Sequence, residues 1–219
     1  MKYIVIGAGG TGGSIGAYMT EAGKDVTLIA RGAHLEAMQK NGLQMETTRK
    51  GNYTVKPVKA ADMEHYDEQP DVIFVCVKGY SLEDTVPFIQ KVAKPETVVI
   101  PILNIYGTGG RLQEKLPELL VTDGCIYIAA EIKRPGCIWQ NGDIFRVVFG
   151  VREPSQYRPE DVYKRQCHPG TRLHGEHRRP DYGAEAGPRL RGGFPPDRIF
   201  LLSRKRDCRS QSLRQYPEI

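Results

Sequence analysis

Residues 3–23 read YIVIGAGGTGGSIGAYMTEAG, and this stretch decides the fold. The apolar, largely β-branched run YIVI predicts a short buried strand. Glycines follow it directly, and the residues after them have helical spacing up to Gly23, which suits the end of a helix. A strand, a tight glycine turn and a helix in this order predict the first unit of an α/β fold.

The glycine turn carries a binding motif. Gly7, Gly9 and Gly12 have the spacing GxGxxG, in which one glycine permits the turn, one lets backbone approach a pyrophosphate, and one lets helix and strand pack closely. The first amide groups of the helix would then face the anion. Glycine-rich turns are common, so the motif alone is weak evidence, and the strand and helix around it strengthen the prediction of a dinucleotide site.

The next apolar strand, within DVTLIARGAH, ends near Arg31, nineteen residues after Gly12. Dinucleotide sites recognise the adenosine ribose at this point of the chain. An acidic residue there bonds the 2′-hydroxyl of NAD, whereas an arginine offers several donors to the 2′-phosphate of NADP. Arg31 therefore favours NADP over NAD. The alternative is a solvated arginine that caps the end of a strand.

The rest of the first 150 residues repeats strand and helix patterns. We expect a helix over AHLEAMQKNG, a β-hairpin from LQMETT and YTVKPVKA, and buried strands in DVIFVCVKGY and TVVIPILN. Ser81 and Asp84 resemble a capping box for a helix over 81–93, in which Pro87 predicts a kink or a late start. Together these units predict a Rossmann-like, doubly wound, mostly parallel sheet. Lys78 and Asn104 follow two of its strands, at the edge where such sheets bind ligands.

The formal net charge of +5 is not spread evenly along the 219 residues. Acidic and basic residues nearly balance up to Glu160, and the basic excess lies after it, where Arg becomes the main cation. Gly and Pro are frequent there, and the longest apolar run is RIFLLS at 198–203. Such a segment buries too little apolar surface to offset its ordering entropy. We therefore expect one domain over residues 1–160 and a basic Arg/Pro/Gly-rich tail over 161–219 without a fixed structure.

The tail begins with DVYKRQ at residues 161–166, which is the translation of GATGTGTATAAGAGACAG, a transposon end used as an adapter in sequencing-library preparation. We interpret the residues after it as a sequencing artefact, either a chimeric join or a lost reading frame. GC-rich DNA read out of frame is rich in codons for Arg, Pro, Gly and Ala. The alternative is a natural basic arm for nucleic acid or anionic surfaces. Aromatic residues are too sparse there to predict a base-stacking platform.

Cysteine usage and the apolar runs indicate the compartment. Cys76, Cys125 and Cys137 lie in or beside strand-like runs, and no CxxC or metal-ligand spacing joins the five cysteines. Reduced thiols of this kind suit the cytosol. The N-terminal apolar run is too short for a signal peptide, and no run approaches membrane-spanning length. We therefore expect a cytoplasmic protein with no metal site.

Six segments, in order, resemble the N-terminal domain of the ketopantoate reductases. They are GAGGTGG, ARGAHLEAMQKNGL, CVKGYSLED, PILN, IAAEIKRPGCIWQNG and RVVFG, between Met1 and about Gly150. The resemblance implies NADPH-dependent reduction of 2-dehydropantoate to pantoate, on the route to pantothenate and coenzyme A. It also implies a small-molecule 2-oxo acid substrate and allows a homodimer, with no membrane or nucleic-acid partner.

The resemblance also assigns roles to individual residues. The pyrophosphate would lie on Gly7, Ala8, Gly9, Gly10, Thr11 and Gly12, and the 2′-phosphate on Arg31. Lys78 would lie near the adenosine end, whereas Asn104 would reach nicotinamide and substrate. Ala130, at the end of the strand CIYIAA, would lie beside the nicotinamide. Ile105 stands where the family usually has glycine, so another 2-oxo acid substrate is an open alternative.

The family's catalytic lysine belongs to a second, helical domain, where it donates a proton to the oxyanion formed at the ketone. No segment of this chain matches that part of the family pattern, and the only lysines after residue 160 are Lys164 and Lys205. We therefore expect the chain to bind NADPH without appreciable turnover. A non-catalytic NADP-binding fragment is the corresponding alternative.

Overall fold

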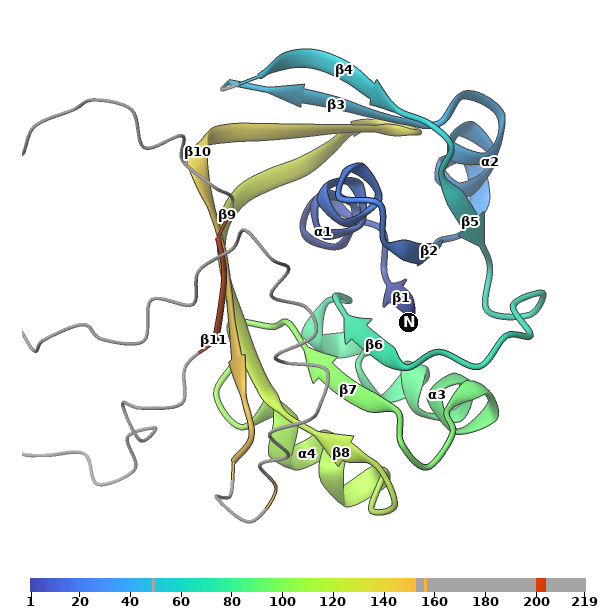
Figure 1. Cartoon of the computed structure of the whole chain (residues 1–219), viewed down its shortest axis with the longest axis vertical. Coiled ribbons are helices and arrows are strands. Elements are labelled where there is room, and N and C mark those ends of the chain that lie inside the picture. The colour runs from blue at the N-terminus through green and yellow to red at the C-terminus, as the bar shows by residue number, and fades with distance from the viewer. Residues whose placement is uncertain (49, 153–155, 157–199, 204–219) are drawn as a thin grey trace, which may run out of the picture.

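The computed structural model describes residues 1–48, 50–152, 156 and 200–203, and its centre is a parallel sheet (Figure 1). The sheet has the order β5-β2-β1-β6-β7-β8, and every pairing in it is parallel. The predicted doubly wound, mostly parallel α/β fold is therefore confirmed. Its strands are β1 (Lys2–Ile6), β2 (Asp25–Ile29), β5 (Lys59–Ala61), β6 (Val72–Val75), β7 (Val98–Pro101) and β8 (Leu120–Val121).

The parallel strands read as apolar runs because both faces of the sheet are covered. Alternate residues of β1 enter two separate cores, with Val5 on one face and Ile4 and Ile6 on the other. Helices α1 (Gly10–Glu21) and α2 (Gly32–Asn41) contribute to the first core, and α3 (Val86–Val92) and α4 (Thr108–Lys115) to the second. One face of the parallel sheet is thus covered by α3 and α4, and the other by α1, α2 and a second sheet.

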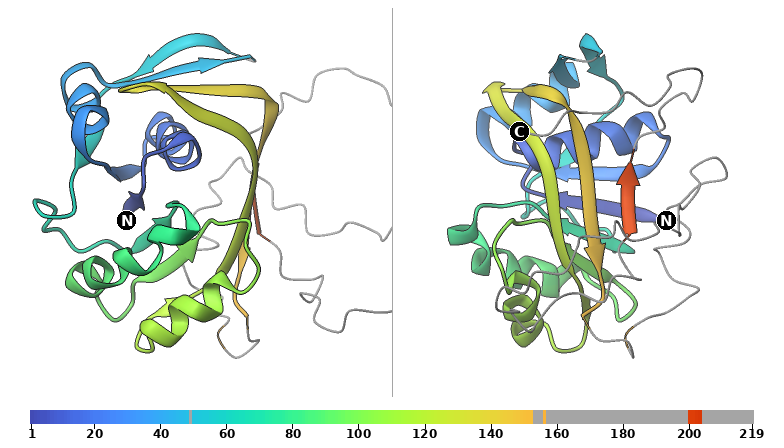
Figure 2. Two further views of the ribbon diagram at one scale, coloured as in Figure 1. Left: turned by 180° about the vertical axis from the view of Figure 1, so that it is seen from behind. Right: turned by 90° about the vertical axis from the view of Figure 1, so that its left-hand side faces the viewer.

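A second, mixed sheet covers α1 on the side away from the parallel sheet (Figure 1). Strands β3 (Leu43–Thr47) and β4 (Gly51–Val55) form the predicted antiparallel hairpin, but its second strand ends at Val55, and Lys59 and Ala60, which were also expected in it, belong to β5 of the parallel sheet. The sequence did not reveal the long hairpin of β9 (Asp123–Arg134) and β10 (Cys137–Gly150), of which only the part CIYIAA was expected as a strand. Figure 2 shows this hairpin running along one side of the molecule.

Strand β10 joins the mixed sheet together. One of its edges pairs with β9, and the other pairs first with β3 in parallel and then with β11 (Phe200–Ser203) antiparallel. Tyr18 of α1 donates a hydrogen bond to the side chain of Gln140 and packs edge-on against Phe145, its ring centroid 4.5 Å away. These contacts hold α1 between the two sheets.

The helix expected over 81–93 begins later than the capping box implied. Residues Gly79–Ser81 and Glu83–Thr85 form two 3-10 turns, and α3 starts at Val86 with Pro87 in its first turn. No side chain caps it, so the Ser81 and Asp84 capping box was wrong. Proline suits the first turn of a helix because its missing N–H has no partner there, which explains the late start.

The predictions for residues 161–219, including Lys164 and Lys205, lie outside the described residues apart from strand β11, which falls in the apolar run RIFLLS. In the part of the chain that the structure describes, no helix is both long and apolar enough to cross a membrane.

Candidate dinucleotide-binding site

The candidate site lies at the carboxyl edge of the parallel sheet. Ile6 of β1 pairs with Ile29 of β2 and with Val75 of β6, which is itself in register with Pro101 of β7. Four strands therefore end at one level, and the loops that follow them carry the predicted residues. Neighbouring strands lie about 4.8 Å apart, so the three steps from β2 to β7 cover roughly 14 Å.

The glycine turn after β1 is held tightly at its start. Gly7 has φ +91°, a left-handed conformation that glycine adopts without strain. The N–H groups of Gly7 and Ala8 both donate to the carbonyl of Ile29, at 3.0 and 3.2 Å. The turn is therefore fastened to the end of β2 before α1 begins at Gly10.

Three glycines of the turn face different surroundings. A Cβ at Gly12 would lie 2.1 Å from the carbonyl oxygen of Gly7, and one at Gly10 would lie 2.2 Å from that of Ala130. A Cβ at Gly9 would have no atom of the described residues within 4 Å. Gly10 and Gly12 are thus required by close backbone packing, whereas packing leaves Gly9 free. Approach of a phosphate to the backbone is the remaining reason for glycine there.

The contact at Gly10 brings two predicted site residues together across the fold. Ala130 belongs to β9, and its backbone lies against the first residue of α1. The sequence placed these residues at one site only through the family resemblance, because they are 120 positions apart. Strand β9 therefore forms a wall beside the N-terminus of α1.

Arg31 lies at the carboxyl end of β2 as the N-cap residue of α2. Its side chain is exposed, and it forms no salt bridge with another described residue. Neither α1 nor α2 has an acidic residue in its first turn. Since helix N-termini carry partial positive charge, these two starts and the Arg31 guanidinium favour an anion at this edge.

Lys78 and Asn104 follow β6 and β7 at the same edge, and both are exposed. The Asn104 amide pairs with the backbone of Ile126 on β9: its Nδ2 donates at 3.0 Å, and its Oδ1 accepts from the Ile126 N–H at 3.1 Å. An amide has two donors and two acceptor lone pairs. With respect to the described residues, one donor and one lone pair of Asn104 therefore stay available for a ligand. The two hydrogen bonds to Ile126 fix the direction in which they point.

Ile105 lies beside Asn104 and is 51% exposed. Its Cδ1 would come within 2.8 Å of a Cβ at Gly79, in the loop after β6. The branched side chain thus bridges the loops after β6 and β7. Tyr80, which follows Gly79, and Tyr106, which follows Ile105, are 88% and 91% exposed, so these two loops present large side chains to solvent.

The sequence did not point to His34, which the structure places at the glycine turn. Its Nε2 lies 2.9 Å from the carbonyl oxygen of Ala8, and its Nδ1 accepts a hydrogen bond of 3.0 Å from the N–H of Gly136. Burial lowers its pKa, partly offset by the bond to Ala8. A single histidine in a helical segment carries no signal of such a bridge, because both partners are backbone groups far away in sequence.

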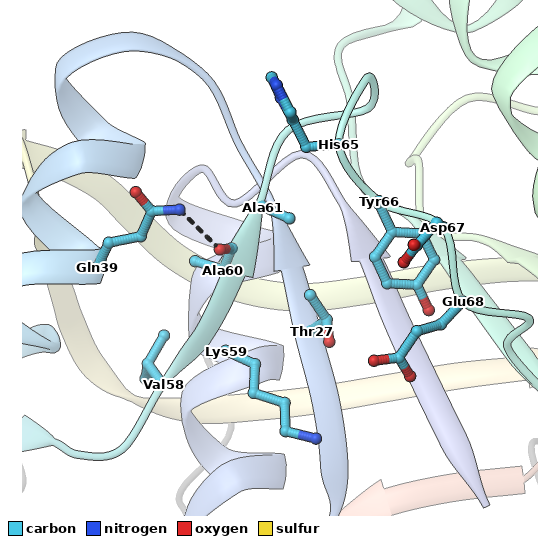
Figure 3. Close-up of a pocket in the computed structure, with 10 residues that line it drawn as sticks. All are labelled: Thr27, Gln39, Val58, Lys59, Ala60, Ala61, His65, Tyr66, Asp67 and Glu68. Atoms are coloured by element: carbon cyan, nitrogen blue, oxygen red, sulfur yellow. Dashed lines mark hydrogen bonds between the residues drawn. The ribbon is translucent and has the colours of Figure 1, made fainter.

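A pocket of about 370 Å³ lies elsewhere, over β2 and β5 (Figure 3). Most of its charged side chains have ionic partners: Lys59 pairs with Asp25, Glu68 with Lys2, and His65 with Asp62. It includes none of the residues predicted to bind the dinucleotide. The lining residues are Thr27, Gln39, Val58, Lys59, Ala60, Ala61, His65, Tyr66, Asp67 and Glu68.

A family model described as ketopantoate reductase PanE/ApbA matches residues 3–154. The chain belongs to the ketopantoate reductase family. This confirms the family expected from the six segments. The roles of the individual residues, from Gly7 to Ala130, remain predictions.

Relatives of known sequence and structure agree with the family. The uncharacterized oxidoreductase YkpB of Bacillus subtilis is 35% identical over 156 residues, which are 68% of this chain and 48% of that protein. A 2-dehydropantoate 2-reductase of Mesorhizobium japonicum is 30% identical over 183 residues, or 74% of this chain and 55% of that protein. The crystal structure of 2-dehydropantoate 2-reductase from Porphyromonas gingivalis W83 superposes with a TM-score of 0.64 at 33% identity, over 73% of this chain and 58% of that one. The chain thus spans about half the length of these relatives.

Proposed function

We propose that this ketopantoate reductase family chain binds NADPH along the carboxyl edge of its parallel sheet. The observation that carries the proposal is the contrast within the glycine turn, where Gly10 and Gly12 are packed against backbone and Gly9 faces open space. The pyrophosphate would lie on Gly7–Gly12 and the 2′-phosphate on Arg31 and the start of α2. Arg31 has no competing carboxylate among the described residues, which supports NADP over NAD.

The nicotinamide would lie at the other end of the edge, near Asn104 and Ala130. NADPH supplies a hydride when bound, and the chain's own part is to hold the dinucleotide and the substrate carbonyl in position. The free N–H of the Asn104 amide is oriented by its two bonds to Ile126. It could donate to a carbonyl oxygen of the substrate, which supports its role in positioning.

We propose 2-dehydropantoate as the substrate, reduced to pantoate. The matched relatives of Mesorhizobium and Porphyromonas carry this activity in their names. A different 2-oxo acid is the second candidate, because Ile105 projects from the loop beside Asn104 onto Gly79. A branched side chain there would narrow the approach to the nicotinamide and favour a slimmer 2-oxo acid.

The chain of 219 residues is expected to bind NADPH but to reduce 2-dehydropantoate slowly. Hydride arrival at a ketone builds charge on its oxygen, which needs an acid within hydrogen-bond reach. Asn104 is a polar contact and not an acid, and no segment of the sequence matches the family's lysine segment. We therefore propose that these residues bind the cofactor but do not supply the proton donor.

The test uses the purified 219-residue chain. NADPH fluorescence titration should show saturable binding, and absorbance at the nicotinamide band should stay nearly constant when 2-dehydropantoate is added. Absence of binding would reject the proposed site. Turnover comparable with an ordinary reductase would reject the proposed division of roles and show that a group of this chain supplies the acid.

A further inference from the structure

His34 forms a bridge between two backbone groups that belong to different sheets. One partner is the carbonyl of Ala8, in the glycine turn after β1 of the parallel sheet. The other is the N–H of Gly136, in the turn between β9 and β10 of the mixed sheet. The imidazole is half-buried, and both Ala8 and Gly136 are buried. Backbone groups buried at this depth need partners within the protein.

The two bonds determine where the proton of the ring lies. Because Nδ1 accepts a hydrogen bond from the Gly136 N–H, it carries no proton. The neutral ring then has its proton on Nε2, which donates to the carbonyl of Ala8. Protonation of His34 would place an N–H against the N–H of Gly136, so the bridge exists only for the neutral ring.

The neighbours of Gly136 show that the bridge is anchored firmly. The Gly136 carbonyl accepts from the Gln44 N–H of β3 at 2.8 Å, and a Cβ at Gly136 would lie 2.8 Å from the Cβ of Ala37 on α2. Gly136 also has φ +74°. The acceptor site on His34 therefore faces a rigid turn that cannot move without disturbing both α2 and β3.

Both peptide groups that flank Ala8 are held by hydrogen bonds. Its N–H donates to Ile29, and its carbonyl accepts from His34. A trans peptide is planar, with its C=O and the next residue's N–H pointing in opposite directions. Because the Ala8 carbonyl is held toward His34, the Gly9 N–H points away from His34. Gly9 is also the glycine at which a Cβ would have no described atom within 4 Å.

We infer that His34 is a positioning residue for the phosphate site: it fixes the Ala8–Gly9 peptide so that the Gly9 N–H faces the bound pyrophosphate. This inference rests on the proposed binding of NADPH. It also makes the β9–β10 turn part of the site, because the ring is itself oriented by Gly136. A neutral ring is required, so acid should weaken binding.

Burial, and not a neighbouring charge, is the main cause of the lowered pKa of His34, although charged groups lie on the surrounding elements. They are Arg31, Glu36 and Lys40 on or beside α2, Lys59 on β5, Glu46 on β3, and Lys133 and Arg134 on β9. Glu46 is paired with Lys133 and Arg134, and Lys59 with Asp25. Because the pKa of His34 is lowered in the folded protein, the bridge is complete above the ordinary histidine pKa of about 6.5. It is lost as the pH falls through the lower pKa of the folded state.

Two variants separate the bonds of the ring from its volume. His34→Phe keeps a ring but leaves Ala8 and Gly136 without partners, and should weaken NADPH binding at pH 8 about tenfold or more. His34→Gln keeps an N–H donor for Ala8 that does not titrate, and should stay within about threefold of the wild-type chain. His65→Ala is the matched control, since His65 is exposed and, among the described residues, pairs with Asp62.

The decisive readout is the pH profile of the NADPH dissociation constant between pH 8 and pH 5. The wild-type chain and His65→Ala should lose affinity in acid more steeply than His34→Gln. The 2′-phosphate of NADPH titrates equally in all three, so the difference between profiles belongs to His34. Equal profiles, or normal affinity of a folded His34→Phe, would overturn the inference.

A second measurement does not depend on the cofactor. Nitrogen-15 NMR of the free protein should show His34 as the Nε2–H tautomer, and His34→Gln should shift the amide signals of Gly9 and Gly136. Failure of the wild-type chain to bind NADPH would reject the proposed function alone. An Nδ1–H tautomer, or unchanged Gly9 and Gly136 signals, would reject the bridge.

Discussion

The two sheets of this molecule bury their strands in different ways. In the parallel sheet, β6 and β7 are buried at every position, because α3 and α4 cover one face and the β9–β10 hairpin packs on the other face beside β7. In the mixed sheet, β9 and β10 are long and expose much of one face, including Tyr127 and Trp139. The parallel sheet aligns the loops that carry the site, and the mixed sheet presses a strand against the start of α1. The candidate site lies where the two meet.

Two glycines of the turn pack against different sheets. Gly12 is packed only against the parallel-sheet unit, where Gly7, Val5 and Cys76 surround it, whereas Gly10 is packed against β9 of the mixed sheet. Gly9 touches neither. Substitutions at the three positions should therefore have distinct effects on folding and on binding.

The largest effect is expected at Gly9. Gly9→Val should abolish NADPH binding while leaving thermal unfolding close to wild type, because the new side chain would occupy the space proposed for the pyrophosphate and a Cβ there would have no described atom within 4 Å. Fluorescence titration and circular dichroism measure the two properties. Normal binding by Gly9→Val would mean that the motif serves only the turn.

Gly12→Ala should lower the free energy of unfolding by about 3 kcal/mol, the upper end of the range for overpacking. Its Cβ would meet the Gly7 carbonyl oxygen at 2.1 Å, a backbone atom that cannot rotate away. Urea denaturation monitored by circular dichroism tests this, with Gly9→Ala as the matched control. A stability equal to that of the control would contradict the packing described here.

Arg31→Ala should remove about 1.5–3 kcal/mol from NADPH binding, the range for hydrogen bonds to charged groups. NADH lacks the 2′-phosphate, so its affinity should change little. The ratio of the two dissociation constants, measured by fluorescence for both proteins, should therefore fall about tenfold or more. The same preference in wild type and variant would exclude Arg31 from the site.

Gly10→Ala should have the smallest effect, about 1 kcal/mol on unfolding, the lower end of the overpacking range. Its Cβ would meet the Ala130 carbonyl on β9, which runs along one side of the molecule (Figure 2) and pairs with β10 alone among the described strands, whereas the turn beneath α1 is fastened to β2. Hydrogen exchange should rise in β9 and stay unchanged in β1. Equal exchange in both strands would show that the two sheets respond as one unit.

The sequence by itself determined the parallel sheet and the order of the site. Four of its strands, β1, β2, β6 and β7, are short apolar runs, so YIVI, DVTLI, DVIFV and TVVIPILN could be assigned locally, and the loops with Gly7, Arg31, Lys78 and Asn104 followed from them. The short edge strands β5 and β8 were not predicted. Local pattern suffices here because burial on both faces leaves no alternation to interpret. The family resemblance added Ala130, which no local pattern would have placed.

Tertiary structure alone decided the mixed sheet and its contacts with the turn. Strands β9 and β10 expose one face and contain Gly124, Gly142 and several charged residues, so beyond CIYIAA their sequence did not predict strands. Pro87 had already indicated the late start of α3, whereas only the structure showed that no side chain caps this helix. His34 became visible only when its two partners, Ala8 and Gly136, came together. Every residue has the same backbone groups, so a sequence does not show which side chain bonds them. Only their positions in space do.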